Sequence, residues 1–207
     1  MLFHRKKLFI LFGIGLMWGL VETFGSPCIR GACGREFGGA ILAGTSFLFI
    51  SSSYFFCKKT ADILMVLVVA VLLKLLSSPL FGIPLFHPSI INPAYAFFSQ
   101  FFLFYLFISI VNKMHLSDFY KGALAGTLAS IFSVFIFPFL QMAIGGSACL
   151  KSGTSIPLAY YYLPITLGCA LTSASFGALL GSQVRKIIYK NNGNQFKWSL
   201  LFSTTKK

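Results

Sequence analysis

Two charged side chains lie within long apolar segments of this chain. Lys74 is in the middle of ILMVLVVAVLLKLLSSPLF, and Glu22 is near the end of LFGIGLMWGLVETFG. An ammonium group at the centre of a bilayer costs about 2.5–3.5 kcal/mol on insertion scales. Such a residue is kept where a carboxylate, backbone carbonyls or a water-filled site offsets that cost. Glu22 and Lys74 are therefore the first candidates for a functional site.

The composition indicates a membrane protein. Hydrophobic residues make up 57% of the 207 residues and charged residues only 10%, whereas a soluble domain carries about 25% charged residues. We therefore predict an all-α integral membrane protein with one domain over residues 1–207. The net charge of +13 comes from basic residues in loops and tails. That distribution favours the lipid bilayer over nucleic acid as the partner.

Six segments are long enough to cross the hydrocarbon core, which takes about 20 mostly apolar residues in a helix. They cover residues 7–24, 39–57, 61–83, 94–112, 121–144 and 158–183, and residues 184–207 form a basic tail. The basic start of the chain resembles a signal peptide, but the small-residue cleavage pattern is absent. We therefore predict that the first helix is retained.

Basic residues orient the helices. With the N-terminus inside, thirteen Lys and Arg residues fall in inner loops and termini, and three fall in outer loops. This asymmetry follows the positive-inside rule. We therefore predict cytoplasmic N- and C-termini and a location in the cytoplasmic (inner) membrane.

Glu22 and Lys74 are predicted to lie at the same depth. Counted from the inner ends at Leu8 and Ala61, they are about 21 Å and about 20 Å into the membrane at a rise of 1.5 Å per residue. A Glu–Lys pair in the outer half would satisfy both charges and could hold a polar ligand. Two structural alternatives are a pair that only positions two helices and a lysine that snorkels outward alone.

The segment between the third and fourth spans, Gly82–Tyr95, contains three prolines and is predicted not to form a continuous helix. It is either a short outer turn or a loop that caps a binding site. Tyr95, Ser99 and Gln100 could face a pocket inside an aromatic wall. A tyrosine at a span end also fits the interfacial aromatic belt.

Small residues occur at GxxxG spacing in three spans. The pairs are Gly15 and Gly19, Gly122 and Gly126, and Gly177 and Gly181. This spacing lets helix backbones approach closely. It predicts either packing within the chain or docking of a partner membrane subunit.

Cysteines supply the remaining reactive groups. Cys28 and Cys33 lie in the first outer loop and Cys149 in the third, where an oxidising exterior would permit a disulfide. The spacing CIRGAC is neither a CxxC redox motif nor a zinc pattern. HExxH, Walker A, GxSxG and Rossmann motifs are absent. We therefore predict no metal site, no cofactor and no catalytic residue.

Three segments of the first half of the chain resemble a family of small bacterial six-span proteins. They are GLMWGLVE (Gly15–Glu22), VLLKLL (Val71–Leu76) and INPAYAFF (Ile91–Phe98). That family is similar to the substrate-binding S components of energy-coupling factor (ECF) vitamin transporters. Its members show Trp-Gly-x-x-Glu in the first helix, a Lys in the third and Asn-Pro-Ala before the fourth. The matching positions are Trp18, Glu22, Lys74, Asn92 and Pro93.

The resemblance implies a ligand bound from the outside, a transmembrane coupling subunit that docks on the first helix, and ATPases that supply energy. Gly15 and Gly19 fall where the docking surface would lie. The vitamin-specific signatures are absent, so no substrate is implied.

We therefore predict the substrate-binding subunit of a small-molecule uptake transporter, which is not an enzyme. Glu22, Lys74 and Asn92 would contact the ligand, with Trp18 and Tyr95 as walls. Two interpretations from other classes remain open. One is a structural or assembly membrane protein in which Glu22 and Lys74 set helix register. The other is a small membrane thiol oxidoreductase that uses the two cysteines of the first outer loop.

Overall fold

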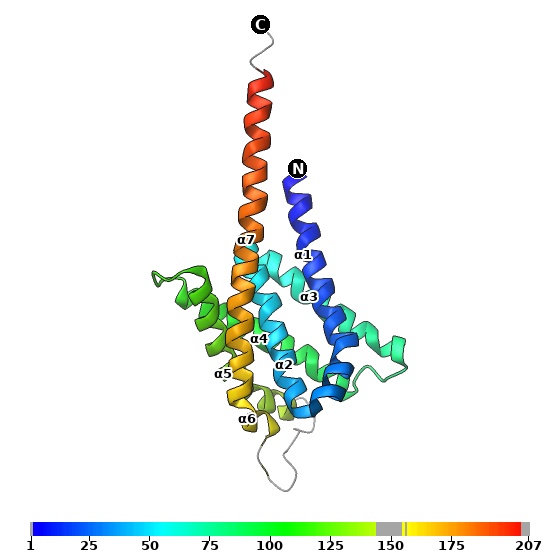
Figure 1. Ribbon diagram of the computed structural model, residues 1–207. Helices are drawn as coiled ribbons and strands as arrows, with labels where there is room; N and C mark the ends of the chain where they lie inside the picture. Colours follow the sequence, from blue (N-terminus) through cyan, green and yellow to red (C-terminus); the bar gives the residue numbers. More distant parts are fainter. Residues whose placement is uncertain (1, 144–154, 156, 204–207) are drawn as a thin grey trace.

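The computed structural model describes residues 2–143, 155 and 157–203, most of which lie in helices (Figure 1). The elements are α1 (Leu2–Leu20), the π-helix η1 (Val21–Gly25), α2 (Ser26–Cys57), α3 (Thr60–Phe81), α4 (Pro88–Val111), α5 (Asp118–Ala143), α6 (Leu158–Tyr161) and α7 (Leu163–Ser203). Six stretches of the described residues are long and apolar enough to cross a membrane: Lys6–Cys33, Phe37–Cys57, Asp62–Phe81, Pro88–Val111, Asp118–Leu140 and Leu163–Ile188. The prediction of six spans is confirmed for this part of the chain.

The first span is longer than predicted. Residues 25–33, expected in an outer loop, continue the helix through η1 into the first turns of α2. The chain then reverses inside α2. This is shown by Gly38, where an added Cβ would come within 3.0 Å of the Cα of Arg30. Eight residues of a straight helix would separate these positions by about 12 Å. The turn between the first two spans is therefore tight and largely helical.

The fourth span also begins earlier than predicted. Only residues 82–87 form a turn, and α4 starts at Pro88 with Pro93 inside it. Proline suits the first helical position because the N–H it lacks has no helical partner there. The Nδ1 atom of His87 accepts a hydrogen bond from the Ser89 N–H at 3.3 Å and caps the start. The prediction that Gly82–Tyr95 contains no continuous helix is therefore wrong for its second half.

Helix α7 packs closely against both α2 and α5. A Cβ on Gly177 would lie 2.4 Å from the Leu48 carbonyl oxygen, and one on Gly181 would lie 2.2 Å from that of Ser52. On the α5 side, Cβ atoms on Gly122 and Gly126 would lie 2.6 and 2.3 Å from alanine Cβ atoms of α7. These two GxxxG pairs therefore pack helices within the chain.

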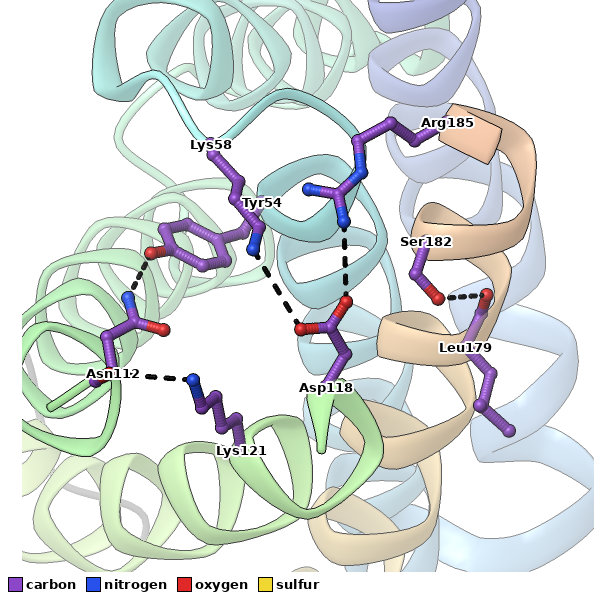
Figure 2. A network of polar contacts seen from close by, with 8 residues as sticks. All are labelled: Tyr54, Lys58, Asn112, Asp118, Lys121, Leu179, Ser182 and Arg185. Atoms are coloured by element: carbon purple, nitrogen blue, oxygen red, sulfur yellow. Dashed lines mark hydrogen bonds and ion pairs between the residues drawn. The ribbon is translucent and has the colours of Figure 1, made fainter. Parts of the chain in front are cut away.

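Polar contacts gather at one end of the bundle, which we call the basic end (Figure 2). Asp118 at the start of α5 pairs with Lys58 at 3.9 Å and with Arg185 of α7 at 3.5 Å. The Asn112 amide donates to the Tyr54 hydroxyl, which links α4 to α2. These groups come from segments predicted to lie in the inner loops and the tail, so the structure places those segments together.

The starts of α1 and α3 are joined at the same end. Lys7 pairs with Asp62, and both side chains are 15% exposed. Helix α7 continues past the bundle at the end where α1 begins, so part of the tail predicted from residue 184 onward is helical (Figure 1).

Candidate functional site

Lys74 reaches the backbone of η1. Its ammonium nitrogen donates a hydrogen bond to the Glu22 carbonyl oxygen at 3.1 Å. In a π-helix a carbonyl pairs with the N–H five residues later, and that residue is Pro27, which has no N–H. Lys74 therefore supplies the donor that Pro27 lacks. The predicted common depth of Glu22 and Lys74 is confirmed.

The Glu22 carboxylate takes no part in that contact. Glu22 is 4% exposed and Lys74 is 5% exposed. Among the described residues, no hydrogen bond to the Glu22 carboxylate and no Glu22–Lys74 ion pair is formed. The expected carboxylate–ammonium pair is corrected to an ammonium–carbonyl contact. The buried Glu22 carboxylate can therefore accept hydrogen bonds from another partner.

Trp18 lies one helical turn from Glu22 and is 1% exposed. Its ring packs against Phe97 of α4, with centroids 4.6 Å apart, and stacks on Phe49 of α2 at 6.2 Å. Its indole N–H is buried and has no acceptor. Trp18 is therefore packed among aromatic rings of three helices with one donor unused. Its predicted role as a wall of a ligand site stays a prediction.

Two further buried oxygens near this region lack partners. Gln100 follows Phe97 by three residues on the buried face of α4, and its Oε1 atom accepts no hydrogen bond. Thr23 follows Glu22, and its hydroxyl is also unpaired. The sequence pointed to Gln100 only as a polar residue within an aromatic run. Nothing singled out Thr23, because an isolated threonine in an apolar helix carries no specific signal.

Asn92 and Tyr95 occupy the first two turns of α4 and are both half-buried. Neither side chain makes a hydrogen bond with Glu22 or Lys74. Their predicted contact with a ligand stays a prediction.

An open groove of about 480 Å³ lies beside these residues, at the far end from the basic network. It runs between η1 and the end of α3, where Phe24 and Phe81 pack edge to face at 5.9 Å. Its lining is Leu20, Thr23, Phe24, Leu73, Leu76, Ser77, Pro79 and Leu80. Thr23 adjoins Glu22, and Ser77 donates to the Lys74 carbonyl. The groove thus borders the buried pair without being lined by it.

Gly15 and Gly19 are buried against α3 of this same chain. A Cβ on Gly15 would lie 2.9 Å from the Val66 carbonyl oxygen, and one on Gly19 would lie 2.7 Å from Leu73 side-chain atoms. The third GxxxG pair therefore also packs helices internally. A partner that docks on α1 would meet its other face, where Phe9 and Met17 are exposed.

Cys28 and Cys33 are exposed and free. No disulfide joins them in the structure. Cys149 lies outside the described residues, so a disulfide to it stays a prediction. No group of three His, Cys, Asp or Glu residues that could hold a metal occurs in the described part of the chain.

The fold and the site define a multi-pass helical membrane protein with a buried, incompletely paired polar cluster. No protein-family model and no curated protein sequence matches the chain. Among solved structures, the crystal structure of an S-component of an ECF transporter is similar, with a TM-score of 0.53 and 17% sequence identity. The match covers 98% of this chain and 97% of that one. The likeness shows that the chain has the fold of that S-component.

Proposed function

We propose that this protein is the substrate-binding subunit of a small-molecule uptake transporter in the cytoplasmic membrane, and that it catalyses no reaction itself. The observation that carries the proposal is a set of buried polar groups without partners. The Trp18 N–H and Gln100 Oε1 have no hydrogen-bond partner, and the buried Glu22 carboxylate forms no hydrogen bond or ion pair with the described residues. An unsatisfied buried polar group costs about 1–3 kcal/mol. A ligand that pairs with several of these groups recovers that cost as affinity.

The proposed ligand enters from the end opposite the basic network. That end is extracellular if the basic loops are cytoplasmic, as the positive-inside rule requires. The groove between η1 and α3 gives access to the level of Glu22. Asn92 and Tyr95 start α4 at the same end and would complete the contacts. The S-component fold supports the expectation of a transmembrane coupling subunit and ATPases as partners.

Native mass spectrometry of the detergent-purified protein tests this proposal. We expect a copurified small molecule that is retained by the wild type and lost from Glu22→Gln. Asp62→Asn is the matched control, because it also changes a carboxylate to an amide but lies at the basic end beside Lys7. Thermal unfolding of each variant shows whether it is folded.

The proposal fails if Glu22→Gln keeps the same ligand as the wild type. It also fails if the wild type carries no small molecule and gains no thermal stability from a metabolite extract of the expressing cells.

One observation favours a structural or assembly role as the second candidate. The bond from Lys74 to the Glu22 carbonyl is explained by Pro27 alone and needs no ligand. In that case Glu22→Gln changes neither the ligand that copurifies nor the binding of partner subunits, and Lys74 substitutions affect only folding. The structure adds no support to the thiol oxidoreductase interpretation, because Cys28 and Cys33 are simply exposed, free cysteines.

A further inference from the structure

A third charge belongs to the region of Glu22 and Lys74. Arg30 follows Glu22 by eight residues on the continuous helical stretch of η1 and α2, about 12 Å along the axis. Side chains of a helix tilt toward its N-terminus, so the Arg30 side chain leans back toward the level of Glu22. Lys74 contacts Glu22 through the backbone carbonyl, and Arg30 lies near enough for its charge to act on the Glu22 carboxyl group.

The stem of Arg30 is covered by the returning part of α2. Gly38 packs against it so closely that a Cβ there would lie 2.9 Å from the Arg30 Cγ atom. The Arg30 Nε atom is buried and donates to no acceptor. A guanidinium held in this way has a free N–H group that can donate a hydrogen bond to an anion.

The donors of the cluster outnumber its charged acceptors. Lys74 uses one of its three N–H groups on the Glu22 carbonyl. The Arg30 Nε–H and the Trp18 indole N–H are unused. The two cations and one carboxylate together carry one net positive charge. Glu22 and Lys74 are buried and Arg30 is half-buried. Burying a net charge is costly unless a partner of opposite sign is present.

The geometry points to a small organic acid as the ligand. Its carboxylate would bind between Lys74 and Arg30, and an N–H or O–H group elsewhere on the molecule would donate to the Glu22 carboxylate. Arg30 is thus assigned as a ligand-binding residue, although its place in the sequence predicted only an outer loop. This inference rests on the proposed function and adds the chemical class of the substrate.

Matched pairs of carboxylic acids and their carboxamides test the inference. The panel includes benzoate with benzamide and indole-3-acetate with indole-3-acetamide, each added to the detergent-purified protein during thermal unfolding. We expect at least one acid to raise the melting temperature while its amide does not. Arg30→Gln should weaken the binding of that acid at least tenfold. Arg185→Gln is the matched control at the basic end and should leave binding unchanged.

The inference is overturned if amides or amines stabilise the protein as well as the acids, or if Arg30→Gln binds the acid like the wild type. It is also overturned if the copurified molecule found by native mass spectrometry is neutral or cationic. In that last case a ligand that depends on Glu22 still supports the proposed function. If no acid stabilises the protein and no molecule copurifies, both the inference and the proposed function fail.

Discussion

Of the three helix pairs that use a GxxxG spacing, α2–α7 and α1–α3 differ in what surrounds the glycines. Between α2 and α7, Gly177 and Gly181 bring two backbones together, and the neighbouring Ser51 hydroxyl donates to the Ala174 carbonyl at 2.7 Å. Between α1 and α3, Gly15 and Gly19 pack against side chains and one carbonyl. There the next turns contain the unpaired groups of Trp18 and Thr23.

The difference shows how one packing device can support two roles. Helices in lipid gain little from the hydrophobic effect against each other, so close backbone contact stabilises their association. The α2–α7 contact adds satisfied polar groups and forms a scaffold. The α1–α3 contact holds η1 beside Lys74, where Pro27 interrupts the backbone hydrogen bonding. Under the proposed function, a ligand would supply partners for the unsatisfied polar groups on that side.

The largest expected effect comes from alanine at the two α7 glycines. The new Cβ atoms would meet backbone oxygens at 2.4 and 2.2 Å, and a backbone cannot rotate away. We expect Gly177→Ala and Gly181→Ala each to destabilise the protein by about 1–3 kcal/mol, the usual cost of overpacking. The melting temperature in detergent measures the effect.

Two matched glycines define the contrast. Gly168→Ala in the same helix has no heavy atom within 4 Å of its new Cβ and should leave the melting temperature unchanged or slightly higher. Gly19→Ala on α1 would meet the Leu73 side chain, its Cβ included, at 2.7 Å rather than a backbone oxygen, and should cost less than Gly181→Ala. Equal losses at Gly19 and Gly181 would remove the distinction between the two interfaces.

The second prediction concerns the α1–α3 side. Lys74→Met removes the donor to the Glu22 carbonyl, and we expect a loss of about 1–3 kcal/mol for a buried acceptor left unpaired. In a Pro27→Ala background the restored N–H can serve the same carbonyl. The loss from Lys74→Met should then shrink by about 1 kcal/mol, a coupling that a double-mutant cycle resolves. Additive effects of the two substitutions would show that Lys74 is not replacing the donor that Pro27 lacks.

The sequence predicted the six spans and the common depth of Glu22 and Lys74, because hydropathy and helix rise are local quantities. It did not predict the kind of contact. Whether Lys74 meets the Glu22 carboxylate or its carbonyl depends on the π register at Val21–Gly25, and that register follows from Pro27 and tertiary packing together.

Residues whose surroundings come from distant segments were harder to predict. Arg30 was assigned to an outer loop because charged residues and glycines follow it, yet the chain stays helical and folds back on it at Gly38. The prolines before Tyr95 suggested an irregular loop, although Pro88 stands where a helix tolerates proline. The GxxxG spacing alone does not tell which helix a glycine pair packs against, because the same spacing can pack against any apolar helix.

The smallest effect is expected at the basic end of the scaffold. Asp118 joins α5 to Lys58 and Arg185 (Figure 2), but its side chain is 28% exposed, and such ion pairs contribute about 0–1 kcal/mol. Asp118→Asn should therefore lower the stability by less than either glycine substitution in α7. Because salt screens partly exposed charges, the difference from the wild type should diminish as sodium chloride is raised during thermal unfolding. A loss as large as that of Gly181→Ala would mean that the ion pairs contribute as much as the glycine contacts to holding α2, α5 and α7 together.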